Sequence, residues 1–196
     1  MNWILLLEQT LNGFQFGILL FLLAAGLTLI FGIMDMINLA HGSLYMMGAY
    51  FAATFTKWTD SFLIGALLAL PTCMLFGVIL ERIALRTLYT RSHLDQVLAT
   101  FGLIIFFNEF VRLIWGPIGL DIPLPELLSG SVELFFGIRY PAFRLVIIAV
   151  GIMVAFLLYL LVSKTRIGML IRAGASNRQM VSALGVNITL LYTVVF

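Results

Sequence analysis

Residues 34–50 read MDMINLAHGSLYMMGAY, and within this apolar stretch the polar residues Asp35, Asn38 and His41 stand three apart. The apolar runs on either side leave almost no room for a water-exposed connection. The chain must therefore reverse direction or break a helix here. Non-helical backbone at membrane depth is tolerated only where protein buries it or where it lines a watery cavity. The stretch predicts an all-α transmembrane protein with a broken helix near residues 34–42.

The composition of the whole chain also indicates a membrane protein. Of its 196 residues, 62% are hydrophobic and only 10% are charged, whereas a soluble domain carries about 25% charged residues. Apolar runs of about twenty residues are long enough to cross the hydrocarbon core of a bilayer as helices. The expected surroundings are therefore membrane lipid. A net charge of +2 without a basic run argues against a nucleic-acid partner.

The hydropathy pattern predicts a single polytopic transmembrane domain over residues 1–196. Five spans are expected, near residues 12–33, 36–56, 62–80, 95–115 and 141–162, and a sixth begins near residue 187. The first apolar segment lacks the basic start of a cleavable signal peptide, so we interpret it as retained.

The distribution of basic residues predicts the orientation. They cluster in two connections that lie two spans apart: Arg82, Arg86 and Arg91 in one, and Lys164, Arg166, Arg172 and Arg178 in the other. Because cytoplasmic loops carry the excess of Lys and Arg, both connections are expected in the cytoplasm and the N-terminus outside. The outer connection, residues 116–140, is broken by prolines and is expected to contain a short strand at Val132–Phe136. It is either a solvated connector or a docking surface for an external partner.

Residues 163–187 read SKTRIGMLIRAGASNRQMVSALGVN and form the second basic connection. Thr165 is placed to cap a short helix that runs until Gly174. Ser176 stands three residues before Gln179, which is the spacing of a capping box for a second short helix. Gly185 is then expected to end that helix in a left-handed conformation. The alternative is a basic loop that only fixes the orientation of the chain in the membrane. Such a loop would not need a pair of short helices.

This loop, residues 163–187, resembles the cytoplasmic coupling loop of ATP-binding-cassette (ABC) importer permeases, and we name it the coupling loop. Its sequence is similar to that of the branched-chain amino-acid permease family at Gly168, Arg172, Ala173, Asn177, Ala183, Leu184, Gly185 and Asn187. Two further stretches resemble the same family: GLTLIFGIMDMINLAHGSLYMMGAY at 26–50, and HLDQVLATFGLIIFFNEFVRLIWG at 93–116.

The resemblance implies a multi-pass permease subunit in a bacterial inner membrane. Its expected partners are a second homologous permease, two cytoplasmic ATPase subunits, and a periplasmic binding protein that delivers leucine, isoleucine or valine. The chain has no G-x-x-x-x-G-K-[ST] motif to bind ATP phosphates, so we expect a transport subunit without enzymatic activity or cofactor. Family permeases continue for several more spans, and we therefore interpret the sequence as truncated at Phe196.

Two groups of residues are expected to carry the function. The first lines the substrate pathway or the broken helix: Asn38, His41, Gly42 and Ser43. The second forms the ATPase coupling loop: Gly168, Arg172, Ala173, Asn177 and Gly185. Asn38 is expected to satisfy backbone groups freed by the break, and neutral His41 to donate to a neighbouring helix; direct contact with the solute is the alternative. Asp35 is expected near the cytoplasmic end of the break. No metal-ligand set is recognised.

Other functions remain compatible with parts of this pattern. A sister importer for urea, amides or other small solutes shares the family's signatures. An ion or proton channel would use Asp35, His41 and Glu109 as a relay, although Glu109 and Arg112, one turn apart, are expected to pair with each other. An intramembrane enzyme using His41 lacks a partnered nucleophile at usable spacing.

Overall fold

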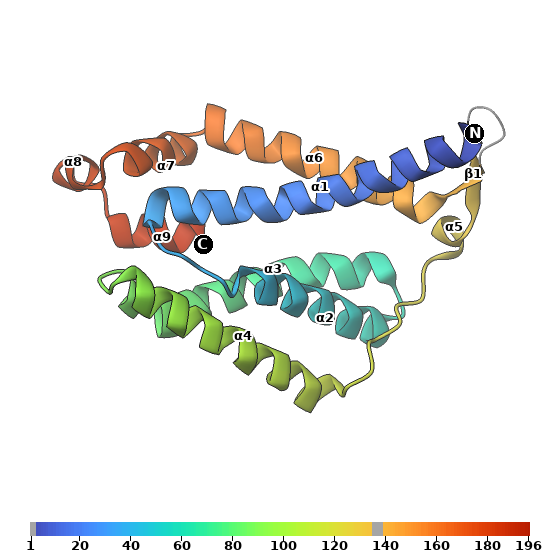
Figure 1. Cartoon of the computed structure of the whole chain (residues 1–196), viewed down its shortest axis with the longest axis horizontal. Coiled ribbons are helices and arrows are strands. Elements are labelled where there is room, and N and C mark those ends of the chain that lie inside the picture. The colour runs from blue at the N-terminus through green and yellow to red at the C-terminus, as the bar shows by residue number, and fades with distance from the viewer. Residues whose placement is uncertain (1–2, 135–138) are drawn as a thin grey trace. The chain divides into compact units, whose positions relative to one another are not determined.

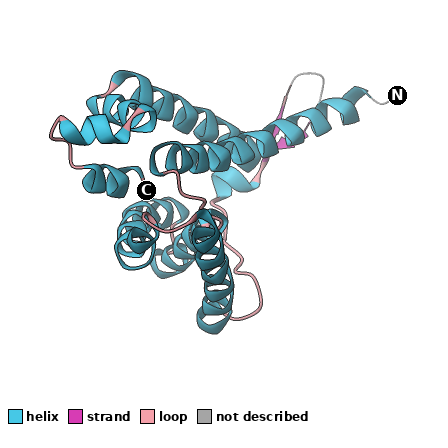
Figure 2. Cartoon of the chain, turned by 60° about the vertical axis from the view of Figure 1, so that its left-hand side comes forward, coloured by secondary structure: helices cyan, strands magenta, loops and turns pink. Residues whose placement is uncertain are grey.

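The computed structural model describes residues 3–134 and 139–196, most of which are helical (Figures 1 and 2). The helices are α1 (Trp3–Met34), α2 (His41–Thr59), α3 (Phe62–Leu80), α4 (His93–Trp115), α5 (Glu126–Ser129), α6 (Ala142–Lys164), α7 (Arg166–Ser176), α8 (Arg178–Ala183) and α9 (Ile188–Val195). A π-helical turn, Glu81–Leu85, and a 3₁₀ turn, Arg86–Leu88, continue α3. Two short strands, β1 (Ser131–Glu133) and β2 (Arg139–Pro141), pair antiparallel.

Four helices in the described ranges are long and apolar enough to cross a membrane. They are α1, α3 with its continuation to Leu88, α4 and α6. The helix expected at 62–80 has those bounds, whereas α1 begins at Trp3 rather than near residue 12. The segments expected to span near 36–56 and from 187 are helical too, but α2 is less apolar than the four and α9 has only eight residues. The strand expected at Val132–Phe136 overlaps β1, and its last two residues lie outside the described ranges.

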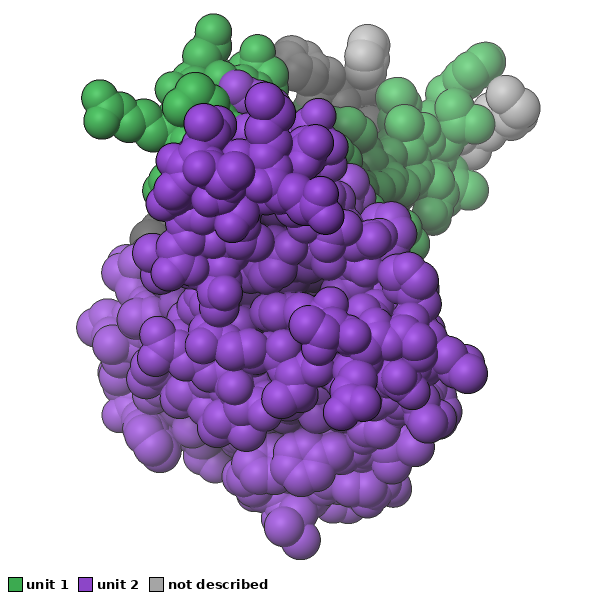
Figure 3. Space-filling model, turned by 90° about the vertical axis from the view of Figure 1, so that its left-hand side faces the viewer, with its two compact units in different colours: residues 1–26, 124–169 green, residues 27–123, 170–196 purple. Residues whose placement is uncertain are grey.

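The chain divides into two compact units, coloured separately in Figure 3. The first comprises residues 1–26 and 124–169. Within it, the hydroxyl of buried Tyr140 on β2 donates to Oδ1 of Asn12 on α1 (3.1 Å), and Arg144 donates to the same oxygen. Gly151 on α6 faces Ile18 so closely that a Cβ would collide with it. These contacts join α6 and the hairpin to the first half of α1.

The second unit comprises residues 27–123 and 170–196, and it contains the segment near residues 34–42 and the coupling loop from residue 170 onward. Its α2 and α3 form a hairpin through Asp60, whose φ is +49°. Gly65 is buried against the backbone of Thr56, so the two helices approach closely. One apolar cluster joins α2 to α4 around Met47, Phe107 and Val111. A second cluster joins the end of α1 to α7, α9 and the turn after α3: Ile30, Ile33, Met34, Met36, Leu85, Ile171, Leu191 and Tyr192.

Candidate substrate path and coupling loop

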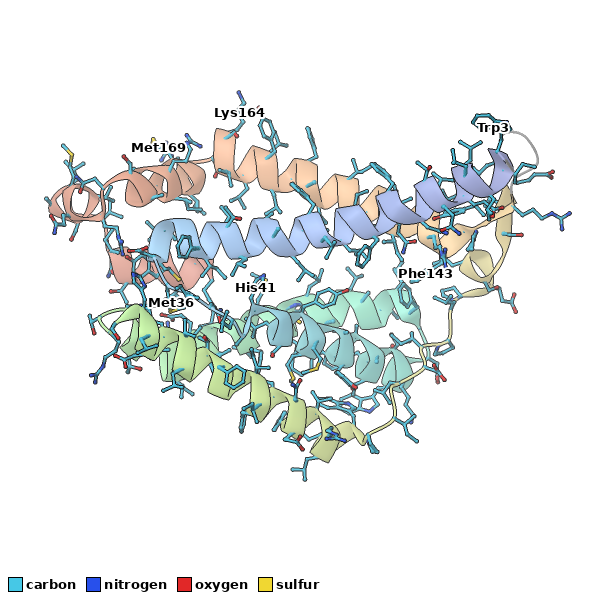
Figure 4. All side chains as sticks on the ribbon, in the orientation of Figure 1. Trp3, Met36, His41, Phe143, Lys164 and Met169 are labelled. Carbon is cyan, nitrogen blue, oxygen red and sulfur yellow. The ribbon has the colours of Figure 1, made fainter. Side chains whose placement is uncertain are left out.

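The broken helix expected near residues 34–42 is confirmed. Helix α1 ends at Met34, α2 begins at His41, and the six residues between them are non-helical; Figure 4 labels Met36 and His41 at this place. Asp35 turns the chain with a φ of +52°. Among non-glycine residues Asp and Asn adopt this left-handed conformation most readily, because their short side chains can hydrogen-bond locally. The acid at the start of the stretch therefore fits the corner where the helix stops.

Two side chains of α4 hydrogen-bond the unwound backbone. The Ile37 N–H donates to Oε1 of Gln96 (3.3 Å), and the Leu39 N–H donates to Oγ1 of Thr100 (3.3 Å). Buried backbone donors left without a partner are costly, so these bonds stabilise the break. Sequence reasoning missed both residues. The available signal was a pair of polar residues four apart, hence on one face of the helix.

Gln96 is itself held in one orientation. It is 3% exposed, and its Nε2 donates to the carbonyls of Leu88 (3.1 Å) and Arg91 (3.3 Å). These two bonds place Nε2 towards the turn before α4, while Oε1 contacts Nδ1 of His93 (3.3 Å) and accepts from the Ile37 N–H. Thr100, fully buried, donates to the Gln96 carbonyl (2.8 Å) and so presents a lone pair to Leu39. Both acceptors on α4 are thus held in place by hydrogen bonds other than those with the break.

Asn38 also stabilises the break, as expected for backbone groups freed there. Its Oδ1 accepts a hydrogen bond from the Ala40 N–H (3.1 Å), which closes a local turn before α2. The side chain is only 2% exposed, yet its Nδ2 has no hydrogen-bond partner among the described residues. Buried polar groups normally have partners. One donor of Asn38 is therefore available for a molecule or segment outside the described structure.

The other residues expected at the break begin α2. His41 is half-buried and Ser43 is buried. No described atom outside its own helix lies within 4 Å of the place that a Cβ on Gly42 would take. Gly48, further along α2, approaches α3 more closely, since a Cβ there would lie 3.2 Å from Sγ of Cys73. Close packing of α2 on α3 thus uses Gly48 rather than Gly42.

The coupling loop forms the two short helices that the sequence predicts, with different boundaries. Oγ1 of Thr165 accepts from the Gly168 N–H (3.0 Å), as expected for a cap. The expected end at Gly174 was wrong: α7 continues to Ser176, and buried Gly174 packs on Ile33, where a Cβ would lie 3.2 Å from Cδ1. Since this contact buries Gly174 inside the helix, the glycine serves close packing rather than termination.

The cap of α8 also differs from the prediction. A capping box at Ser176 was wrong, because Ser176 is the last residue of α7. Asn177 caps α8 instead, and its Oδ1 accepts from the Met180 N–H (3.0 Å). Gly185 has the expected left-handed conformation, with a φ of +86°. Arg172 and Asn177 are exposed, Ala173 is half-buried, and buried Gly168 packs against carbonyl groups at the end of α6.

The coupling loop contacts the break directly. Nη2 of Arg178, the first residue of α8, lies 3.1 Å from Oδ2 of Asp35, and Nη1 donates to the carbonyl of Met34 (3.3 Å). Hydrogen bonding to Tyr192, and secondly to Asp35, holds the pKa of Arg178 above its ordinary value despite partial burial. Asp35 therefore lies at the end of the break that contacts α8 of the coupling loop.

A buried polar cluster lies at the turn after α3. Glu81 is completely buried, and its carboxylate accepts from Tyr89 (2.8 Å), Thr193 (3.0 Å) and Arg86 (3.3 Å). Burial raises the pKa of the Tyr89 phenol far above its ordinary value, and the bond to Glu81 raises it further, so the hydroxyl remains a donor. Thr193 belongs to α9, so the cluster joins α9 to the turn after α3. Arg86 was expected only as one of the basic residues of a cytoplasmic connection.

The comparison with protein families matches residues 9–196 to the family described as "Branched-chain amino acid transport system / permease component". The chain belongs to this family. The expected pairing of Glu109 with Arg112 is confirmed, because the two side chains form an exposed ion pair on α4 (3.3 Å).

Curated relatives carry similar names. This family member is 32% identical over 197 residues to the high-affinity branched-chain amino acid transport system permease protein BraD of Pseudomonas aeruginosa, and 31% identical over 194 residues to LivH of Escherichia coli K12. Both comparisons cover 92% of this chain and 62% of the relative. A probable LivH of Methanocaldococcus jannaschii is 31% identical over 180 residues, covering 87% of this chain and 55% of the relative. The chain thus spans about three fifths of their length, and no solved structure matches it.

Proposed function

We propose that the chain is the membrane-spanning permease subunit of an ABC importer that moves branched-chain amino acids across the inner membrane. In this proposal separate cytoplasmic ATPase subunits, two per transporter, hydrolyse ATP. A second homologous permease completes the pathway, and a periplasmic binding protein delivers the solute. Family membership and the names of the relatives support this assignment.

The single observation that carries the proposal is the unwound segment between α1 and α2. Transporters commonly place the solute beside discontinuous helices near the middle of the membrane. Here the segment has buried polar partners on α4 and one unused buried donor, Nδ2 of Asn38. A carboxylate or carbonyl oxygen of a small solute is the acceptor that this amide suits. His41, Gly42 and Ser43, at the start of α2, would form the adjoining wall of the path.

The coupling loop would receive the movement of the ATPase. Helix α7 is amphipathic, and its inner face packs through Ile171 and Gly174 onto the end of α1. Exposed Arg172 and Asn177, with half-buried Ala173, would meet the ATPase surface. Gly168 and Gly185 fix the two ends of the helical pair, one by close approach to α6 and the other by its left-handed backbone.

Solute uptake tests the proposal in the full-length permease assembled with its partner subunits. Asn38→Leu should abolish ATP-dependent uptake of radiolabelled leucine at matched membrane expression, because it removes both the turn acceptor and the free donor. Asn108→Leu, the same change at an exposed position of α4, is the matched control and should leave uptake intact. Uptake of urea rather than leucine would assign the sister importer, and flux without ATP would assign a channel. Full leucine uptake in Asn38→Leu would contradict the role of the break.

A further inference from the structure

The end of α1 and the second half of the coupling loop are packed as one piece. Ile171 of α7 is buried in the cluster that contains Ile33 and Met34. Gly174 approaches Ile33 so closely that an added Cβ would lie 3.2 Å from its Cδ1. Since close-packed contacts of this kind resist sliding, α7 and the last turn of α1 should move together.

Arg178 extends this attachment past the last turn of α1 to the corner of the break. One guanidinium nitrogen binds the carboxylate of Asp35 (3.1 Å) and another binds the carbonyl of Met34 (3.3 Å). A cation at this place also complements the negative end of the α1 dipole. The corner is therefore held by α8 as well as by its own chain.

The other half of the unwound segment is bound elsewhere. Ile37 and Leu39 are hydrogen-bonded to Gln96 and Thr100 of α4. The six-residue break is thus attached to the coupling loop at its start and to α4 further on. Any displacement of α7 and α8 relative to α4 must be taken up between these two attachments.

We propose that the Asp35–Arg178 pair couples the movement of α7 and α8 to the unwound segment, and so to the solute path that contains Asn38. Arg178 and Asp35 are positioning residues in this scheme, since neither needs to touch the solute. The inference rests on the proposed function, because the movement is the one that an ATPase would impose on the coupling loop.

Both partners are partly exposed, with side-chain exposures of 43% for Arg178 and 52% for Asp35. Exposed ion pairs contribute little to stability. Removing the pair should therefore change energy coupling more than folding. Coupling between sites in proteins commonly corresponds to at least about a fivefold effect, and we expect a loss of that order in leucine transported per ATP hydrolysed.

The test uses the complete transporter in proteoliposomes with leucine as the solute. Asp35→Asn keeps a residue that tolerates the left-handed corner but removes the charge, and Arg178→Gln removes the cation. Each should lower the ratio of leucine transported to ATP hydrolysed about fivefold, while ATP hydrolysis and the melting temperature stay near wild type. The double variant should be no worse than either single variant, because both remove one interaction.

Two controls match these variants in chemistry but not in place. Asp60→Asn changes an acid with a similar left-handed backbone, at the far end of α2, and Arg91→Gln changes an exposed arginine before α4. Both should transport as wild type. Unchanged ratios in Asp35→Asn and Arg178→Gln, or losses that add in the double variant, would overturn the inference. Absence of ATP-driven leucine transport in the wild type would instead contradict the proposed function.

Discussion

Replacing Gln96 by Leu should release one particular amide of the break. Leucine has a similar size, so the change removes hydrogen bonds without opening a large cavity. The Ile37 N–H loses its acceptor, and the carbonyls of Leu88 and Arg91 lose a donor. The Leu39 N–H keeps its bond to Thr100. The effect should therefore be confined to one half of the unwound segment.

The magnitude follows from the burial of the groups left behind. A buried donor or acceptor without a partner costs about 1–3 kcal/mol. Arg91 is exposed, so its carbonyl can bind water, and the Leu88 carbonyl keeps its bond from the Arg91 N–H (3.1 Å). Only the half-buried Ile37 N–H is left without a partner, which gives a loss of about 1–3 kcal/mol in stability. If about 1.4–2.8 kcal/mol of this loss lowers the free energy needed to open the break locally, the Ile37 amide should exchange roughly 10- to 100-fold faster.

Hydrogen–deuterium exchange with residue resolution measures this directly. Gln96→Leu should accelerate Ile37, Thr100→Val should accelerate Leu39, and each should leave the other amide less affected. Gln9→Leu, the same chemical change at an exposed position of α1, is the control and should alter neither amide. Unchanged exchange at Ile37 in Gln96→Leu would refute the claim that α4 side chains hold the break.

Three further changes test other parts of the structure. Glu81→Gln should lower the stability in detergent by about 1–3 kcal/mol, since a fully buried carboxylate loses charge-assisted bonds, whereas Glu8→Gln should leave the melting temperature unchanged; equal melting temperatures would contradict this. Gly168→Ala should reduce the folded yield, because a Cβ would collide with carbonyl groups of α6; a normal yield would contradict that packing. Single cysteines at Ser129 and Ser176 in a cysteine-free background should react with an impermeant reagent from opposite sides of the membrane, and labelling of both in intact cells would overturn the predicted orientation.

The local features of the fold could be predicted because they depend on near neighbours in the sequence. The break was predicted because polar Asp35 and Asn38 stand where two apolar runs leave no room for a loop. The Glu109–Arg112 pair follows from helical spacing. The left-handed Gly185 follows from the absence of a Cβ. Each of these depends on residues a few positions apart.

The boundaries of α7 and α8 could not be predicted because a distant contact decides them. Ser176 and Asn177 are both good capping residues. The choice depends on whether α7 ends at Gly174, and it does not, because Gly174 packs on Ile33. These two residues are far apart in the chain. Local capping rules therefore selected the wrong residue by one position.

The roles of the polar residues in the stretch 34–50 depend on partners elsewhere in the chain, which a hydropathy pattern does not identify. A hydropathy pattern treats Gln96 and Thr100 as interruptions of an apolar helix, and Arg178 as a charge that sets orientation. In the folded chain the first two accept hydrogen bonds from the break, and the third binds Asp35. Because unwound backbone in a membrane must be satisfied by protein, an apparent break in a hydrophobic sequence implies that matching polar residues exist elsewhere in the chain. Searching apolar helices for buried polar pairs one turn apart is therefore a way to identify the helix that holds such a break.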